Sequence, residues 1–368
     1  MNESSYTYNE YSLPRVLGES PVTGRYKTVP EDFAVTEILG FSPEFVEKGQ
    51  QHWLRIRKTG VNTGAIEKQL ARALGIHPRD IGYSGMKDRM AVTEQWFSVQ
   101  LPALQSIDWP VWFSEHMHGD VFPGGEVTLL EAVRSHRKLR RGVHKANHFC
   151  LRVRELTHKD DFIERVAQLA EGGAVANYFG PQRFGKQGDN VAQALRMIDG
   201  EFQVRDRKLR SILLSSVRSY LFNQYLAQRI QSDLPALCEG DVVILDGSQS
   251  YFTVGDDVAA VAERLAQGDV QVSGPMFGES SSPAQGRPAA LEQKILAQYA
   301  ELHAGLCAAR MGHERRPLWL RVSDLSLVWL DDSVAELRFT LPAGAFATSV
   351  LAELGQFSEG NHANFTQQ

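Results

Sequence analysis

A single acid, Asp88, lies between two cations, Lys87 and Arg89, in a stretch with the composition of a turn. Gly82 and Gly85 precede it and allow the chain to bend tightly. An ionised carboxylate can act as a nucleophile or accept a proton, and a neighbouring cation keeps it charged. The pattern therefore indicates a candidate catalytic acid. A solvated turn, in which Asp bonds to nearby backbone, is the alternative that this short motif leaves open.

The segments around this acid have the periodicity of strands. Residues 93–101 alternate between two faces, which predicts a strand directly after the turn. The same alternation predicts strands at 24–39 and at 51–58. Residues 62–75 predict a helix, because they begin with capping Asn and Thr residues and end on glycine. An acid on a turn between strands is well placed to act on a substrate.

The second half of the chain has a different character. Between residues 161 and 306 the apolar spacing is mostly helical, and then strands return with a hairpin pattern at 325–341. Three helices are predicted in this middle part, at 212–230, 258–265 and 291–306. Strands at both ends around a helix-rich middle indicate a sheet-based domain that the C-terminal segment completes.

Length and composition limit the class of protein. With 368 residues, 43% hydrophobic and 23% charged, the chain has the profile of a globular protein of one or two domains. It contains no run of eighteen apolar residues, so we expect no membrane-spanning helix. Cys150, Cys238 and Cys307 lie far apart and form no Cys-x-x-Cys pair, which indicates neither a zinc cluster nor a disulfide framework. Because residues 1–6 are also polar, unlike a signal peptide, we expect a cytoplasmic location.

A basic strip stands out against the net charge of −5. Residues 131–156 contain eight Lys or Arg against two Glu, a local charge of +6, so the rest of the chain carries −11. A concentrated basic strip on an acidic protein is a candidate track for phosphate groups. A solvated charged face is the alternative reading. The cations Arg205, Arg207 and Lys208, which precede the helix predicted at 212–230, form a second candidate.

Nucleotide-binding motifs are absent. Residues 180–187 have the glycine spacing of a P-loop, but Gln187 replaces the Ser or Thr that would hold magnesium. Pro181 and Phe184 also remove or crowd the amides that such a loop needs. No two glycines are spaced Gly-x-Gly, so the dinucleotide fingerprint is missing and a cofactor-dependent RNA methyltransferase is disfavoured.

The stretch around Asp88 resembles the catalytic motif of the TruD-type tRNA pseudouridine synthases. The match runs from Ile81 to Leu101 and includes Gly-Met-Lys-Asp-Arg and Ala-Val-Thr-Glu-Gln-Trp-Phe. Four other stretches are similar to the same family, so that the likeness covers nearly the whole chain: residues 27–33, 140–149, 177–185 and 341–349.

This resemblance implies an α+β fold. The expected architecture is a pseudouridine-synthase-like catalytic domain, with a mixed or antiparallel sheet flanked by helices, interrupted by an inserted helix-rich α/β domain of the TRUD type. The changes of periodicity in the sequence agree with it. We therefore expect catalytic segments at 1–172 and 319–368, with the inserted domain at 173–318.

Carried over position by position, the resemblance implies that Asp88 is the catalytic aspartate and that Phe33, Asn147 and Phe346 line the substrate pocket. Phe149 is similar to the pocket aromatic of the family. Aromatic faces can hold an unstacked base and an amide can hydrogen-bond to its edge. Simple core packing remains open for each Phe, and a turn-capping role remains open for Asn147.

Cations are expected in two roles. Lys27 is a candidate, beside Lys87 and Arg89, for the group that keeps the Asp88 carboxylate charged. Expected RNA contacts are taken from the basic strip and from the stretch at 177–185: Arg137, Lys138, Arg140, Arg141, Lys145 and Arg183.

The implied reaction is isomerisation of a uridine, at position 13 in the D-arm of tRNA, to pseudouridine. The base never leaves and no redox or group-transfer step is needed, so we expect no cofactor and no metal. The expected partner is tRNA, with no membrane and no protein partner. A non-catalytic RNA-binding or RNA-folding protein on the same scaffold is the alternative.

Overall fold

The computed structural model describes residues 12–41, 46, 49–102, 106–185 and 188–360. Contacts divide the chain into two compact units. We call one the sheet unit (Ser20–Gly173, Arg321–Ala347 and Leu354–Gln368) and the other the helical unit (Met1–Glu19, Ala174–Leu320 and Thr348–Glu353). The polar N-terminal stretch at 1–6 lies outside the described residues.

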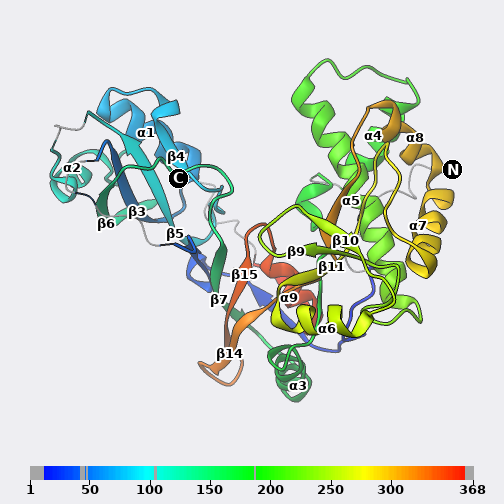
Figure 1. The fold of residues 1–368 in the computed structure, drawn as a ribbon. Helices are drawn as coiled ribbons and strands as arrows, with labels where there is room; N and C mark the ends of the chain where they lie inside the picture. Colours follow the sequence, from blue (N-terminus) through cyan, green and yellow to red (C-terminus); the bar gives the residue numbers. More distant parts are fainter. Residues whose placement is uncertain (1–11, 42–45, 47–48, 103–105, 186–187, 361–368) are drawn as a thin grey trace. The chain divides into compact units, whose positions relative to one another are not determined.

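A mixed sheet dominates the sheet unit (Figure 1). The part of the chain that the structure describes contributes ten strands to it: β1 (Thr23–Tyr26), β2 (Phe33–Ile38), β3 (Gln51–Thr59), β4 (Ile81–Tyr83), β5 (Val92–Gln100), β6 (Glu126–Ser135), β7 (Ala146–Arg154), β14 (Ser323–Trp329), β15 (Ala335–Pro342) and β16 (Gln356–Glu359). The main path follows the order β14-β15-β7-β2-β5-β3-β6, while β4 pairs with β5, and β1 with β16 and β7.

Two pairings bring distant segments together. β2 runs parallel to β5, with Ala34 opposite Val92, so the chain before β2 and the turn before β5 lie at the same end of the sheet. β7 runs antiparallel to β2 and places Asn147 opposite Glu37. The candidate acid therefore meets residues that are far from it in sequence.

Helices cover the sheet at two places. α1 (Thr63–Leu74) and α2 (Trp109–His116) bury Ile66 and Phe113 in one core with Leu54 of β3 and Phe97 of β5. α3 (Lys159–Ala170) packs on β14 and places Phe162 against Trp329, with ring centroids 6.4 Å apart.

The opposite face of β3 and β5 is covered by a loop. Trp53 and Trp96 point to this face and form a small core with Leu139, which lies between β6 and β7. Because successive residues of a strand point to opposite faces, each of these strands contributes to two cores. This loop contains most of the basic strip.

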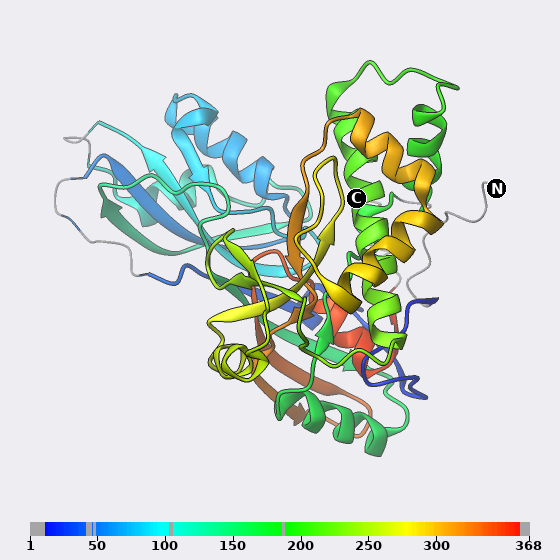
Figure 2. The ribbon, with the colours of Figure 1, turned by 45° about the vertical axis from the view of Figure 1, so that its right-hand side comes forward.

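The helical unit is organised around α5 (Arg207–Gln231), which is visible as the long helix in Figure 2. Its other helices are α4 (Asn190–Ile198), α6 (Val258–Gln267), α7 (Gly286–Gln298), α8 (Ala300–Ala308) and α9 (Ala347–Leu354). Its strands are β8 (Val175–Ala176), β9 (Val242–Leu245), β10 (Tyr251–Thr253), β11 (Val270–Met276), β12 (Glu314–Pro317) and β13 (Trp319–Leu320). They form a sheet in the order β10-β9-β11-β12 and a short β8–β13 pair.

The α+β class and most predicted elements are confirmed, with two corrections. The strand predicted at 24–39 is wrong as one element, since a 3₁₀ turn at Pro30–Asp32 separates β1 from β2. The Asp32 carboxylate stabilises this break by accepting the N–H groups of Thr28 and Val29. The helix predicted at 291–306 is two helices, α7 and α8, because the chain turns out of helical geometry at Tyr299.

One boundary differs from expectation and another agrees with it. α5 begins at Arg207, earlier than predicted, because the Asp206 side chain accepts the Lys208 N–H and caps it. At the end of α1, Gly75 adopts φ +65°, the left-handed geometry expected of a terminal glycine. Within the described residues, none of the helices combines the length and apolarity needed to cross a membrane.

The close approach of β4 to the basic loop gives a stability prediction. A Cβ added at Gly82 would lie 2.1 Å from the main-chain oxygen of Leu139. We expect Gly82→Ala to lower the free energy of unfolding by about 1–3 kcal/mol, because the loop must move off the sheet. Urea unfolding measures this, with Gly64→Ala on α1 as the matched control. Position 64 has open space and helical geometry, so that variant should gain roughly 0.5–1 kcal/mol; an equal loss in both would contradict the argument.

Candidate active site

Asp88 lies on the turn between β4 and β5, which is anchored by polar contacts. The Thr63 hydroxyl donates to Gln95 at 2.9 Å and accepts the Lys87 N–H at 3.1 Å. The Gln95 amide donates to the Gly85 carbonyl at 3.1 Å. Thr63 and Gln95 are buried, so the turn is held from beneath while the Asp88 side chain stays 34% exposed.

The Asp88 carboxylate has two donors. Lys27 donates to Oδ2 in a short ion pair, and the Met90 N–H donates to Oδ1 at 3.0 Å. The Lys27 ammonium lies 3.3 Å from Glu359 and 4.5 Å from the centre of the Phe33 ring. Lys27 has φ +51°, an uncommon geometry for a non-glycine residue, which the surrounding contacts maintain.

These contacts set the charge of the acid. Partial burial raises the pKa of Asp88, but the hydrogen bonds and charge of Lys27, the Met90 N–H and the charge of Lys58 together outweigh it. The resulting pKa lies below the ordinary value for Asp, so the carboxylate is ionised at neutral pH. The site thus holds a reactive anion that remains partly open to solvent.

Lys58 is a second cation at this turn, which the sequence analysis did not single out. Its side chain is fully buried and donates to the main-chain carbonyl of Asp88 at 2.7 Å. Burial lowers the pKa of Lys58 to about 8, although the Asp88 carboxylate acts in the opposite direction. Lys58 is the last residue of the strand predicted at 51–58, and a lysine at that position was the feature of the sequence that could have identified it.

Lys87 and Arg89, the sequence neighbours of Asp88, serve other groups. Arg89 donates to the Gly60 carbonyl at 2.9 Å. Lys87 lies 3.2 Å from the Glu37 carboxylate and donates to Oδ1 of Asn147 at 2.9 Å. Of the three candidate cations, Lys27 is the one that pairs with the carboxylate, because successive residues of a turn point in different directions.

Glu37 is another residue that sequence reasoning missed. Its side chain is 0% exposed and accepts hydrogen bonds from the Ser84 hydroxyl and the Trp96 N–H. The Lys87 side chain, 7% exposed, neutralises this carboxylate. An acid on the same strand face as Phe33 and Val35 was the signal that could have identified it.

The candidate pocket residues differ in exposure. Phe33 and Phe149 are buried with ring centroids 6.1 Å apart, and Phe149 stacks on Phe339 at 5.5 Å. Phe346 follows β15 and is 37% exposed. Its loop is tied to the residue that precedes β7 by the Ala343 N–H, which donates to the Lys145 carbonyl at 3.0 Å.

Asn147 is buried at the start of β7, beside His144. Its Nδ2 lies 3.4 Å from Nε2 of His144. Burial, and then the charge of Lys87, lower the pKa of His144, so the ring is neutral and Nε2 can accept from the amide. Thus Lys27 contacts both Asp88 and Phe33, and Phe33 packs on Phe149. Asn147 is linked to this set through Lys87, the sequence neighbour of Asp88.

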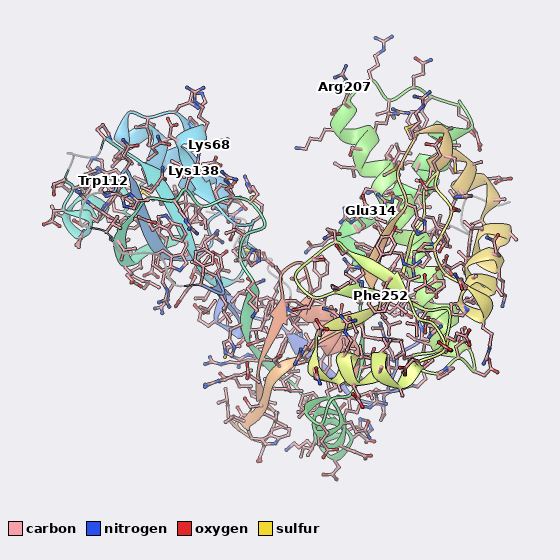
Figure 3. All side chains as sticks on the ribbon, viewed as in Figure 1. Lys68, Trp112, Lys138, Arg207, Phe252 and Glu314 are labelled. Atoms are coloured by element: carbon pink, nitrogen blue, oxygen red, sulfur yellow. The ribbon has the colours of Figure 1, made fainter. Side chains whose placement is uncertain are left out.

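The candidate RNA contacts of the basic strip lie mostly on the loop between β6 and β7, where Figure 3 labels Lys138. All five are exposed: Arg137, Lys138, Arg140, Arg141 and Lys145. Arg141 lies over the Tyr83 ring at 3.8 Å and bonds to its hydroxyl. Arg183 belongs to the helical unit, where it donates to Ser215 at 3.1 Å.

Comparisons with known proteins agree with this description. The family model described as tRNA pseudouridine synthase D (TruD) matches residues 14–203 and 189–354. The tRNA pseudouridine synthase D of Methylococcus capsulatus is 40% identical over 348 residues, 94% of either chain. The protein of the same name from Aeromonas salmonicida is 41% identical over 351 residues, 95% of this chain and 96% of its own.

A solved structure supports the fold. The crystal structure of the protein assigned as tRNA pseudouridine synthase D in Methanosarcina mazei superposes with a TM-score of 0.70, at 21% identity, over 95% of this chain and 97% of that one. The chain therefore belongs to the tRNA pseudouridine synthase D (TruD) family. The resemblance in its motifs is confirmed.

The ion pair with Lys27 predicts a titration change. Replacing Lys27 with Met removes the main group that lowers the pKa of Asp88, so the Asp88 titration midpoint should move to higher pH. The ionised carboxylate stabilises the folded protein above the pKa that Asp88 has in the unfolded chain, and this stabilisation is lost as pH falls through the folded-state pKa. It should be smaller in Lys27→Met. Carboxyl-carbon NMR of Asp88 measures the midpoint. Lys68→Met, an exposed lysine on α1, is the control; equal midpoints in both variants would contradict the assignment.

Proposed function

We propose that this chain isomerises a uridine of tRNA to pseudouridine, with Asp88 as the catalytic residue and uridine 13 of the D-arm as the target. The observation that carries the proposal is the ionised, partly exposed Asp88 carboxylate, held by Lys27 and the Met90 N–H. Membership of the TruD family supports the reaction and the tRNA substrate.

The reaction needs one anion. The N1–C1′ bond breaks, the uracil turns and C5 joins C1′; C5 then loses its proton to the solvent and N1 gains one, so the product is an isomer of the substrate. A carboxylate can assist by attacking C1′ or C6, or by taking a proton from the sugar, and each route requires its ionised form. The cations around Asp88 supply that form at neutral pH.

The target base must leave its stack to reach Asp88. Phe346 is the pocket aromatic that is most exposed and can meet an unstacked base, while Phe33 and Phe149 form the packed wall beneath Lys27. Base stacking on an aromatic ring is worth roughly 1–3 kcal/mol, enough to offset part of the cost of unstacking. Phe346 is therefore the proposed platform.

Asn147 is proposed to hold the edge of the base as a donor. The Lys87 ammonium can only donate, so it fixes the amide with Oδ1 toward itself. Of the two N–H groups on Nδ2, one faces Nε2 of His144 and the other can donate to the base. A donor is suited to a uracil carbonyl. When the ring turns about its N3–C6 axis, O2 and O4 exchange places, so the same N–H can bond to the base before and after the turn.

The sheet unit is proposed as the catalytic body. Asp88, Lys27 and Asn147 all belong to it, although its segments lie on both sides of the helical unit in sequence. We propose catalytic segments at 1–172 and 319–368, with 173–318 as the inserted domain. The two compact units depart from this division at Met1–Glu19 and Thr348–Glu353, which belong to the helical unit. The exposed cations of the basic strip and Arg183 are proposed RNA contacts, and the free thiols of all three cysteines fit a cytoplasmic enzyme.

Asp88→Asn tests the catalytic assignment. The variant keeps the shape of the side chain but not its charge, so tritium release from C5-labelled uridine in tRNA should fall below detection, while tRNA binding stays within a few-fold. Residual isomerisation at a substantial rate would refute the mechanism. If the protein without substitutions binds tRNA but no tritium is released from the labelled uridine, the alternative of a non-catalytic RNA-binding protein is favoured.

Asn147→Asp tests the donor role. The aspartate keeps an acceptor for Lys87 but loses the amide N–H groups. We expect single-turnover isomerisation to slow roughly 10- to 100-fold, the effect of about 1.5–3 kcal/mol for one hydrogen bond to a polarised group. Asn223→Asp, at a buried amide of the helical unit, controls for the general effect of a buried acid. A rate unchanged in Asn147→Asp would remove the amide from the reaction.

A further inference from the structure

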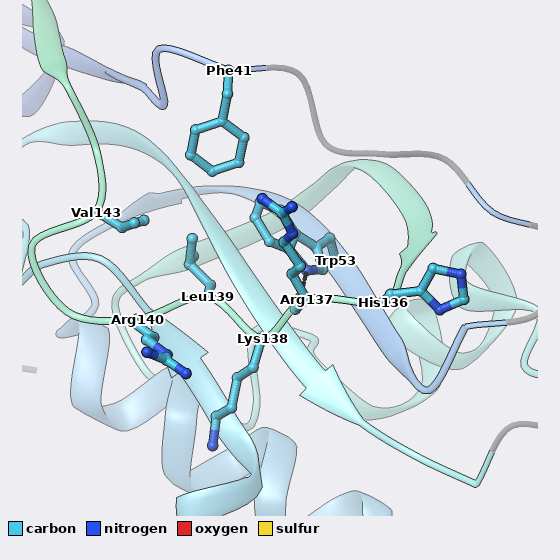
Figure 4. A pocket seen from close by; sticks show the side chains of 8 residues that line it. All are labelled: Phe41, Trp53, His136, Arg137, Lys138, Leu139, Arg140 and Val143. Carbon is cyan, nitrogen blue, oxygen red and sulfur yellow. Dashed lines mark hydrogen bonds between the residues drawn. The ribbon is translucent and has the colours of Figure 1, made fainter.

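A cavity lies in the sheet unit, beside the loop between β6 and β7 (Figure 4). Its volume is about 510 Å³, within the range of roughly 300–1,000 Å³ that is usual for small-molecule pockets. The residues that line it are Phe41, Trp53, His136, Arg137, Lys138, Leu139, Arg140 and Val143. None of these eight is acidic, so an anion that enters the cavity meets no opposing charge from its lining.

The floor of the cavity is rigid. The Trp53 indole N–H donates to the Arg137 carbonyl at 2.7 Å, and the Leu139 N–H donates to the Ser98 hydroxyl at 2.9 Å. Trp53 and Leu139 are each only 2% exposed. The loop is thereby fixed onto β3 and β5, so the cavity is formed before any ligand arrives and binding need not pay for ordering it.

The rim combines apolar surface with positive charge. Phe41 is 45% exposed and Val143 is 41% exposed, whereas most large apolar side chains of this unit are buried. Phe41 is held against Trp53, with ring centroids 6.1 Å apart. The side chains of His136, Arg137, Lys138 and Arg140 are exposed around them. An exposed aromatic ring next to several cations is the surface that single-stranded nucleic acid binds.

The loop also connects this cavity to the Asp88 turn. The Gly142 N–H donates at 2.7 Å to the carbonyl of Ser84, on the turn that carries Asp88. Val143 is four residues from Asn147, a separation of at most about 14 Å in an extended chain. These two links tie one edge of the cavity to the Asp88 turn and to Asn147.

We propose that the cavity is a second nucleotide subsite, which holds an unstacked nucleotide of the tRNA near the target uridine. Its base stacks on Phe41 over the apolar floor, and its phosphates contact Arg137 and Arg140. The proposal rests on the proposed function, which supplies tRNA as the ligand. It adds a separate claim about which residues bind that tRNA. Stacking of this kind accepts any base, so the subsite contributes affinity and register.

The test compares Phe41→Ala, Phe41→Tyr and Phe41→Leu, each in the Asp88→Asn background, with an unmodified tRNA transcript as the probe. Phe41→Ala should weaken binding roughly 5- to 150-fold, the equivalent of about 1–3 kcal/mol of stacking. Phe41→Tyr should bind within a few-fold of the parent, and Phe41→Leu should resemble Phe41→Ala. Val111→Ala, at an exposed apolar residue of α2, should leave the affinity unchanged.

The salt dependence of tRNA affinity distinguishes the stacking contact of Phe41 from the phosphate contact of Arg140. Phe41→Ala should leave the slope of log affinity against log salt unchanged, whereas Arg140→Ala should reduce it by roughly 0.7–0.9. Equal affinity of Phe41→Ala and parent, or full rescue by Leu, overturns the stacking subsite. If Phe41→Ala does not fold, the Tyr and Leu variants decide alone.

Failure of this inference is distinct from failure of the proposed function. Tritium release by the unmodified protein tests the reaction without reference to Phe41. A protein that isomerises uridine while all Phe41 variants bind tRNA equally would keep the proposed function and lose the subsite.

Discussion

The site depends on the contacts that the buried carboxylate of Glu37 makes with the turn before β5. This carboxylate lies on β2 with no solvent contact, and three groups satisfy it: the Ser84 hydroxyl, the Trp96 N–H and the Lys87 ammonium. An uncompensated buried charge costs several kcal/mol, so the sheet folds stably only when the turn supplies Ser84 and Lys87 at this position. The same contact that neutralises Glu37 positions the turn that carries Asp88.

The cations of the site have separate tasks. Lys87 neutralises Glu37 and orients Asn147, Arg89 closes the turn onto Gly60, and Lys27 pairs with the Asp88 carboxylate. Lys58 holds the backbone of Asp88 from inside the sheet unit. A buried lysine is costly, and its proximity to an anion offsets part of that cost. The outcome is a carboxylate that is ionised and fixed in place yet one-third exposed, as a group that must reach a substrate needs to be.

The elements were largely predictable, and the errors have physical causes. Alternation of apolar residues predicted β3, β5 and the hairpin of β14 and β15 with small boundary differences. The predicted strand at 24–39 failed because the Asp32 carboxylate stabilises a turn that a period-two pattern does not reveal. The helix at 291–306 failed because helical periodicity continues across Tyr299 although the backbone turns there. The spacing of apolar residues shows which face of a strand or helix is buried. It does not show where a polar contact interrupts that strand or helix.

By itself, the sequence determined the family, the candidate acid and the candidate pocket residues, because the motif at 81–101 and the stretches around 27–33 and 140–149 are specific at the level of residue type. It also placed the basic strip. Only the tertiary structure decided which cation serves which anion. Lys27 reaches Asp88 from 61 positions away, because the parallel pairing of β2 with β5 brings their preceding segments to one end of the sheet. Charges that are adjacent in sequence point apart on a turn, while charges on neighbouring strands meet, so ion pairing follows strand register and cannot be read from sequence order.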